Sequence, residues 1–331
     1  MLGYIIRRVA IMIPTLILIS MLSFLVVELP PGDMASAYVS RLERMGEEFR
    51  GDATEMLEAL RRRFGYGEPV HVRYVKWARD FLRGSWGHSF YWDLPVRAVI
   101  QDRILTTVAI AFLTMLIGTA VSWPAGVGAA IRQYSLFDNV FSFIAFFMMA
   151  VPNFLFALVL MYLSFELIDF VPGGLFSADM IDEPWSWRKF LDLLAHLWMP
   201  LVILGFESIG GGVRTIRANV LDQIRQPFVT TARAKGVPET RLLIKYPIRM
   251  AANPWISSIG WLLPALLSGE VLVSTVLNIP TIGPLMLQGA MNQDTQVAGA
   301  IVMLLSTLTV IGTLISDLLL GVLDPRIRVA E

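Results

Sequence analysis

Apolar and polar residues follow one another along this chain in long blocks. Six apolar stretches stand out, over residues 9–29, 104–131, 137–168, 190–212, 256–279 and 297–323. Each is long enough for a helix that crosses the hydrocarbon core of a membrane, which takes about 20 residues. The first five each contain a proline, which such helices tolerate where they pack against other helices. We therefore predict an all-α integral membrane protein with six transmembrane helices.

The composition supports this prediction. Of the 331 residues, 55% are hydrophobic and 16% are charged, whereas about 25% are charged in a typical soluble domain. The formal net charge is zero, so no overall basic charge points to nucleic acid as a partner. The chain has no cysteine, which excludes disulfides and thiolate metal sites.

Arg7 and Arg8 precede the first apolar stretch, a charged start that is also typical of a signal peptide. The stretch is longer than the roughly 7–15 apolar residues of a signal peptide, so we expect a retained helix. We divide the chain into residues 1–30, a tail with the first transmembrane helix, and residues 31–103, an external insertion. Residues 104–331 then form a core with five transmembrane helices and a cytoplasmic loop at 213–255.

The insertion is polar, and basic and acidic residues balance within it. Residues 42–49, 54–64 and 74–82 have the spacing of short amphipathic helices. The insertion exceeds the roughly 60 residues below which basic loops are held in the cytoplasm, so its arginines permit an external location. The pattern fits a solvated cap, and a docking surface for an external partner is the alternative.

Basic residues are concentrated between the fourth and fifth apolar stretches. Residues 214–254 contain eight basic and two acidic side chains. An excess of lysine and arginine is typical of cytoplasmic loops, and six spans place both termini on one side of the membrane. We therefore expect a multi-pass protein whose two termini and loop 213–255 are cytoplasmic.

Proline and glycine divide this loop into short elements. Pro227 suits the first position of a helix, and Gly236 suits the position that ends one. Pro238 can begin a second helix, with Glu239 well placed in its first turn. The pattern predicts a helix, a glycine turn and a second helix.

The loop allows two interpretations. Ala232 and Gly236 are four residues apart, so a helix would place them on one face that permits close docking into a partner. Arg233 and Lys235 could then pair with acidic groups at the rim of the partner's cleft. Alternatively, the loop is a basic segment beside the membrane that only sets topology or contacts anionic lipid.

Several short motifs occur in the order found in a known family. In chain order they are Arg7-Arg8 with Pro31-Gly32-Asp33, the segment 83–90, Pro152 with Phe154, the segment Thr-Ala-Arg-Ala-Lys-Gly at 231–236 with Pro254, and Asp-Pro-Arg-Ile-Arg at 324–328. Through them, nearly the whole chain resembles the permease subunits of binding-protein-dependent ABC importers, in the oligopeptide, dipeptide and nickel class. Segment 231–236 resembles the family's cytoplasmic coupling motif.

This resemblance implies the type I permease fold of ABC importers and a subunit with no catalytic activity of its own. In the cytoplasmic membrane of a bacterium or archaeon, it would receive solute from an extracytoplasmic binding protein. It would bind no cofactor, since two ATPase subunits would bind ATP and magnesium, and it would pair with a second, usually different, permease. The implied ATPase-coupling residues are Thr231, Ala232, Arg233, Ala234, Lys235 and Gly236.

The chain departs from the family pattern in two places. Thr230 stands where the general coupling motif has glutamate, and residues 274–277 read Ser-Thr-Val-Leu where this class often has Glu-Thr-Val-Phe. A carboxylate occurs one helical turn earlier instead, at Glu270. These departures and the long insertion resemble members linked to oligosaccharides, so both peptides and oligosaccharides are candidate solutes.

Two carboxylates, Glu207 and Glu270, lie furthest inside the predicted spans. Ionisable residues within a membrane are costly and are functional suspects. With Ser274 they are our candidates for lining the pathway, although either carboxylate could simply hydrogen-bond a neighbouring helix. The alternative function is an ion-coupled secondary transporter that uses these carboxylates, for which an inverted repeat would be typical; we detect none.

Motifs for other chemistry are absent from the sequence. It contains no P-loop, no H-E-x-x-H and no G-x-S-x-G motif, which argues against ATP binding and against an intramembrane hydrolase. The three histidines, His71, His88 and His196, are scattered and are better explained as structural residues than as ligands.

Overall fold

A computed structural model describes residues 2–28, 68–89, 91–170 and 173–323, with the side chains of 2–4, 26–28, 259–270 and 322–323 outside the description. The predicted amphipathic segments 42–49 and 54–64 and the motifs at 31–33 and 324–328 lie outside the described residues. The chain divides into two compact units. The first comprises Met1–Ile11, Arg103–Pro284 and Leu308–Glu331, and the second comprises Met12–Asp102 and Leu285–Thr307.

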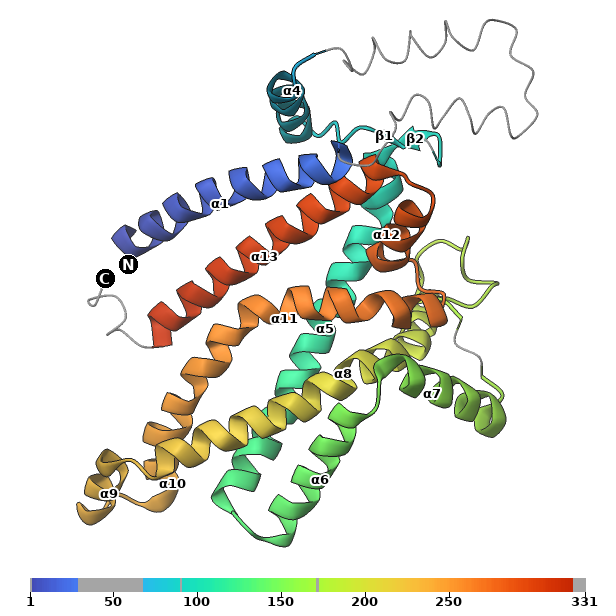
Figure 1. The fold of residues 1–331 in the computed structure, drawn as a ribbon. Coiled ribbons are helices and arrows are strands. Elements are labelled where there is room, and N and C mark those ends of the chain that lie inside the picture. Colours follow the sequence, from blue (N-terminus) through green and yellow to red (C-terminus); the bar gives the residue numbers. More distant parts are fainter. Residues whose placement is uncertain (1, 29–67, 90, 171–172, 324–331) are drawn as a thin grey trace, which may run out of the picture. The chain divides into compact units, whose positions relative to one another are not determined.

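The described residues are almost entirely helical (Figure 1). The helices are α1 (Leu2–Glu28), α4 (Val70–Leu82), α5 (Val96–Ile131), α6 (Leu136–Ala150), α7 (Asn153–Ile168), α8 (Trp187–Ile224), α9 (Pro227–Ala234), α10 (Glu239–Leu243), α11 (Arg249–Val276), α12 (Ile282–Met291) and α13 (Thr295–Leu323). A π-helical turn, η1 (Ile244–Ile248), joins α10 to α11, and two short antiparallel strands, β1 (His88–Ser89) and β2 (Leu94–Pro95), precede α5.

Among the described residues, four segments are long and apolar enough to cross a membrane, namely Ile5–Leu25, Val96–Ile131, Trp187–Ile224 and Thr295–Gly321. The pair α6 and α7 would add a fifth, but the two helices are bent by 101° at the break before Asn153. The remaining predicted span, 256–279, lies in α11, part of which has side chains outside the description. An all-α membrane protein is confirmed, and the number of six transmembrane helices stays a prediction.

Several predicted boundaries were wrong. Helix α5 begins at Val96 rather than at 104, because Val96 and Ile100 are fully buried and extend its packed face beyond the apolar run. Helix α4 begins at Val70, directly after Pro69, rather than at 74. Helix α12 was not predicted at all, although Pro284 in its first turn is a usual sign of a helix start.

The predicted end of the fourth span at Gly212 was also wrong, because α8 continues to Ile224. Its glycines allow close helix packing. A Cβ atom on Gly210 would lie 2.7 Å from the carbonyl oxygen of Ala145 in α6, and one on Gly212 would lie 2.5 Å from Oγ of Ser122 in α5. Small residues permit such approaches between membrane helices. The glycine run therefore packs α8 against α5 and α6.

The first unit is built around α8. Helix α6 lies alongside it, and α11 and α7 also contact it (Figure 1). One apolar core joins α5, α7, α8 and α11 and contains Ile110, Ala157, Met199, Ile203, Leu204, Val273, Leu277 and Ile279. At the other end of α8, a second core of Ala130, Ile216, Val220, Ala251 and Trp255 packs it against α5 and the start of α11. The direction of α8 is thus fixed at both ends.

The second unit contains α4, which packs near the C-terminal end of α1, and the two strands. Tyr74 and Trp77 of α4 pack their rings against Phe24 of α1, with centroids 5.7 and 5.8 Å away. In the strand region, Gly84 and Gly87 have φ values of 84° and 94°, which favour glycine. These two glycines belong to the motif at 83–90, so the motif encodes a turn.

Candidate functional site

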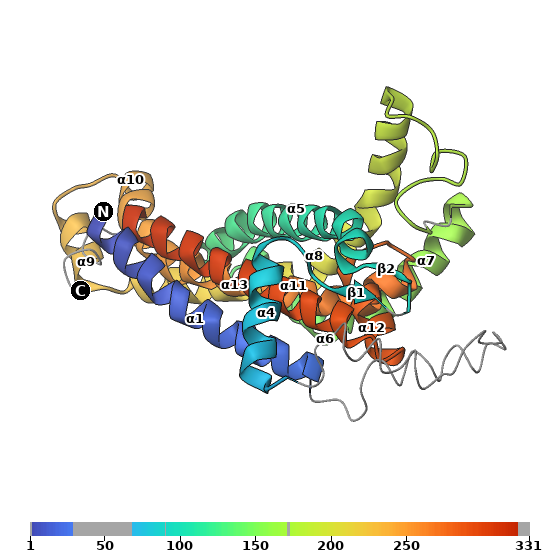
Figure 2. The same cartoon turned by 90° about the horizontal axis from the view of Figure 1, so that it is seen from above.

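The predicted coupling element lies at the end of α8, between α8 and α11 (Figures 1 and 2). Helix α9 begins with Pro227 at its first position and ends at Ala234, and Gly236 follows with a φ of 77°. Helix α10 then begins at Glu239, directly after Pro238, and runs on through η1 into α11. The predicted helix, glycine turn and second helix are confirmed.

A small apolar core of its own holds the element together. Val229 and Ala232 of α9 pack against Leu242 of α10, and all three are buried. Val237, Leu243 and Tyr246 cover this core. Helix α9 has only eight residues, too few to be stable alone, so its shape depends on these contacts. The element is therefore a defined structural unit.

The burial of Ala232 corrects one expectation. We predicted a small-residue face, made of Ala232 and Gly236, that is open to a partner. Ala232 is 8% exposed and faces the core of the element, whereas Thr231, Arg233, Ala234, Lys235 and Gly236 are exposed. The face of α9 available to a partner is thus the opposite one, which also carries Thr230.

An ion pair closes the glycine turn. Nε and Nη2 of Arg233 donate to the two carboxylate oxygens of Glu239, at 3.0 and 2.6 Å. The guanidinium lowers the pKa of Glu239 through these hydrogen bonds. Both side chains are about half exposed, so the pair positions the turn more than it stabilises it. Arg233, expected to reach toward a partner, is thereby partly engaged within the element.

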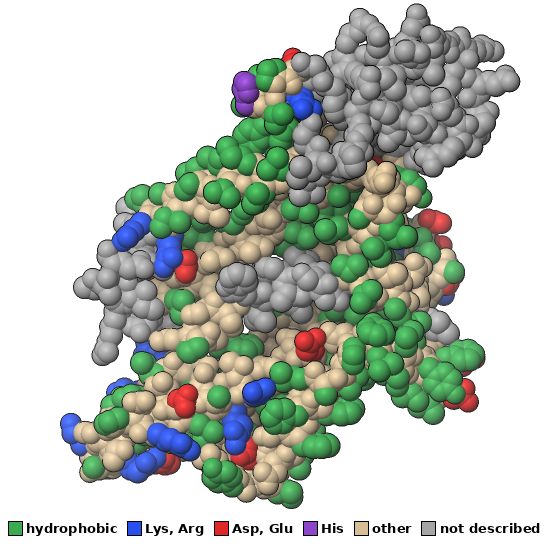
Figure 3. All heavy atoms as spheres, in the orientation of Figure 1, with side chains coloured by type: hydrophobic (Ala, Val, Ile, Leu, Met, Phe, Trp, Pro, Cys, Tyr) green, Lys and Arg blue, Asp and Glu red, His purple; other side chains and the backbone are tan. Residues whose placement is uncertain are grey.

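Basic side chains surround this end of the first unit. In the space-filling view, lysine and arginine gather around α9 and α10 (Figure 3). The exposed ones include Arg225, Arg233, Lys235, Arg241 and Lys245. A surface of this kind favours an acidic partner surface or the headgroups of anionic lipids.

A salt bridge that the sequence analysis missed joins α8 to α6 on the same side. Arg217 of α8 donates from Nε and Nη2 to the carboxylate of Asp138, at 2.5 and 2.8 Å. The backbone N–H of Tyr134 also donates to Asp138, which is buried. Ser135 caps α6 by accepting from the N–H of Asp138. The spacing of Ser135 and Asp138 was a readable sign of a helix start.

Of the two candidate pathway carboxylates, only Glu207 has a side chain within the described residues. It is exposed on α8, and its Oε2 accepts a hydrogen bond of 3.1 Å from Nδ2 of Asn153, the first residue of α7. The side chain of Glu270 lies outside the described residues. Ser274 is 1% exposed, so in this structure it is enclosed between helices and does not line an open surface.

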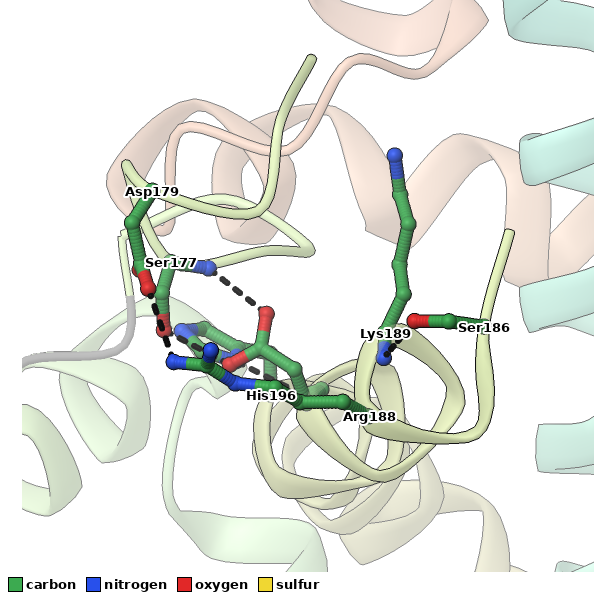
Figure 4. Close-up of polar contacts among 7 residues, drawn as sticks. Ser177, Asp179, Ser186, Arg188, Lys189 and His196 are labelled. Carbon is green, nitrogen blue, oxygen red and sulfur yellow. Dashed lines mark hydrogen bonds and ion pairs between the residues drawn. The ribbon is translucent and has the colours of Figure 1, made fainter. Parts of the chain in front are cut away.

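A polar cluster at the start of α8 holds the loop of residues 173–186 (Figure 4). Asp192 accepts from both the backbone N–H and Oγ of Ser177, at 2.8 and 2.6 Å. The Nζ of buried Lys189 donates to the carbonyl oxygens of Ile181 and Glu183. His196 is buried, with Nδ1 2.8 Å from the carbonyl oxygen of Asp192. Within the described ranges, no group of histidines and carboxylates could hold a metal ion.

Comparison with known proteins places most of the chain in one family. The family described as "Binding-protein-dependent transport system inner membrane component" matches residues 122–329. The matched part includes the last ten residues of α5 and all of α6 to α13, and therefore the element at α9 and α10.

Individual relatives match nearly end to end. The oligopeptide transport system permease protein AppB of Bacillus subtilis is 32% identical over 334 residues, which cover 99% of this chain and 100% of that protein. The dipeptide transport system permease protein DppB of Escherichia coli K12 is 29% identical over 344 residues, covering 99% of each. The peptidoglycan transport system permease protein YejB of Agrobacterium fabrum is 27% identical over 355 residues, covering 98% of each.

Proposed function

Since this chain belongs to the family of binding-protein-dependent transport system inner membrane components, we propose that it imports short peptides as one permease subunit of an ATP-driven importer. The family establishes an ABC importer permease of type I fold. The peptide substrate is our inference from the relatives named for oligopeptides and dipeptides. We consider oligosaccharides less well supported, because among the relatives described above only the one named for peptidoglycan, a polymer of sugars and peptides, relates to a glycan.

The observation that carries the proposal is the element at α9 and α10. It has its own core, so it can receive a force as a unit, and it is joined to α8 by the two residues Arg225 and Gln226. Helix α8 runs on for 38 residues without a break. A displacement of α9 would therefore reach the part of α8 that lies within the membrane.

The remaining partners follow from the same proposal. Two ATPase subunits, which bind ATP and magnesium, close and push the exposed face of α9, and a binding protein outside the membrane delivers the peptide. A second permease, a different chain, completes the pathway. Both termini lie in the cytoplasm, and the membrane is the cytoplasmic membrane of a bacterium or archaeon. This chain itself supplies binding surfaces and motion, and hydrolysis of ATP occurs on its partners.

Reconstitution tests this function against ion-coupled transport. The complete importer is placed in liposomes, and uptake of labelled tri-alanine is measured with and without ATP, the ATPase subunits and a proton gradient. We expect uptake only when ATP and the ATPase subunits are both present. Uptake by the permeases alone under a proton gradient would instead support a secondary transporter that uses Glu207 or Glu270.

A further inference from the structure

One face of α8 is polar or small from the middle of the helix to its end at Ile224. The exposed residues of this face are Glu207, Arg214, Thr215, Ala218 and Asp222. They follow one another at helical spacing, within an arc of about 100°. A Cβ atom added to Gly211, one turn after Glu207, would meet nothing within 4 Å. The face is therefore open in this chain.

Glu207 lies within the apolar part of α8, residues 190–212. It is about 26 Å along the helix from Phe190 and about 8 Å from Gly212. An exposed carboxylate within an apolar span is costly in lipid, so it faces either a water-filled route or a polar group of a partner. Glu207 thus marks the side of α8 that is turned away from lipid.

Asn153 determines how Glu207 is presented. It begins α7 immediately after the 101° bend, and its Nδ2 holds Oε2 of Glu207 at 3.1 Å. Its own Oδ1 is buried and accepts no hydrogen bond from the described residues. Glu207 forms no ion pair within the described part of the chain. The exposed carboxylate of Glu207 is therefore an accessible acceptor that lacks a positively charged donor within the described residues.

We propose that Glu207, positioned by Asn153, binds the N-terminal ammonium group of the peptide during its passage. This inference rests on the proposed import of peptides. An ammonium group supplies the positive charge and the hydrogen-bond donors that the pair lacks. Every peptide with a free N-terminus carries this group whatever its side chains, so one carboxylate can serve substrates of varied sequence. Gly211 leaves space beside the carboxylate for the peptide backbone.

A cysteine reporter beside Glu207 tests the proposal directly, since the chain has no cysteine of its own. Gly211→Cys is introduced, with Ala218→Cys as a second reporter on the same face. The modification rate of each thiol by a charged methanethiosulfonate is measured in the assembled membrane complex. Tri-alanine and N-acetyl-tri-alanine are added at millimolar concentration, without the binding protein, so that the permease alone selects between them.

We expect tri-alanine to protect the thiol and the acetylated peptide to protect it at least tenfold less well. Glu207→Gln retains the shape of the side chain and a carbonyl oxygen for Asn153. We expect it to raise the half-protecting concentration of tri-alanine about tenfold, as for the loss of one charge-assisted hydrogen bond. The matched control is Glu166→Gln, an exposed glutamate of α7, which should leave protection unchanged.

Equal protection by both peptides, no protection by either, or equal behaviour of the two glutamine variants would overturn the proposal. The last result is expected if Glu207 pairs with a cation of the second permease. ATP-driven uptake of tri-alanine by the unmodified importer tells a failure of the ammonium site apart from a failure of the proposed function. Uptake without a role for Glu207 rejects only the ammonium site, whereas no uptake of peptides rejects peptide import itself.

Discussion

Arg217 of α8 and Asp138 of α6 form a two-point ion pair near the end of α8 that carries the coupling element, with contacts of 2.5 and 2.8 Å. The side chain of Asp138 is 2% exposed and that of Arg217 is 26% exposed. Together with the close contact of Gly210 with Ala145, the pair fixes α6 to α8 at two levels. A displacement of α8 would therefore carry α6 with it.

Asp138→Asn tests this connection. The change keeps the size of the side chain but leaves the guanidinium of Arg217 without its counter-charge, so we expect a loss of about 1–3 kcal/mol of stability. The measurement is thermal unfolding of the purified complex in detergent, with ATP-driven uptake alongside. Asp182→Asn, at an exposed position in the loop before α8, is the control. Equal stability of the two variants would show that the pair is unimportant.

Gly236→Val addresses the turn after α9. At a φ of 77° a β-branched residue is strained, although a Cβ atom there would meet no neighbour within 4 Å. We expect normal insertion and a strong loss of ATP-driven uptake, because the turn sets the direction of α9. Gly173→Val also enters open space, but Gly173 has no positive φ, so uptake should persist. Full uptake by the Gly236 variant would count heavily against docking at α9.

The ion pair of Arg233 and Glu239 should make the stability of the coupling element depend on pH. Arg233 lowers the pKa of Glu239 in the folded chain. The pair therefore contributes to the free energy of unfolding at a pH above the pKa of an unfolded glutamate, about 4.3. This contribution is lost as the pH falls through the lower folded value. We expect Glu239→Gln to unfold slightly earlier than the unmodified chain at pH 7, and we expect the difference to disappear once Glu239 is protonated in the folded chain as well. A difference that persists at low pH would assign the effect to packing.

Asp294 connects the strand region of the second unit to the start of α13. Its carboxylate accepts from Oγ of Ser89 at 2.5 Å and from the N–H of Tyr91, and it caps α13 by accepting from the N–H of Val297. We expect Asp294→Ala to cost about 0.5–2 kcal/mol for the cap alone. Amide hydrogen exchange should accelerate at Tyr91 and Val297 and stay unchanged in the control Asp102→Ala, at an exposed position of α5. Unaltered exchange at Tyr91 would contradict the anchoring role.

How much the sequence reveals depends on how local each feature is. Pro227 and Gly236 act through their own backbone geometry, so the ends of α9 were predictable. The inward direction of Ala232 depends on Leu242, ten residues away, and the pattern of α9 alone suggested the opposite face. The partnership of Glu207 with Asn153 requires the bend between α6 and α7, which hydrophobicity does not encode.

The glycine run at 210–212 shows the same limit. The apolar stretch 190–212 ends with these glycines, so the predicted span ended there too. In the fold, Gly210 and Gly212 lie where a side chain would collide with α6 and α5, and α8 continues through them. The distinction comes from neighbours on other helices. The family motif at 231–236 remained recognisable because its residues are contiguous.

The central claim is that the exposed face of α9 contacts an ATPase subunit. Since the chain lacks cysteine, one can be placed at Thr231 or Lys235, with controls at buried Val229 and at Trp185, exposed in the loop of residues 173–186. The measurement is crosslinking of each cysteine to the ATPase subunits in the assembled complex, with and without ATP. We expect crosslinks from 231 and 235 that change with ATP, and none from 185. Absence of crosslinks from α9, with uptake intact, would contradict the account.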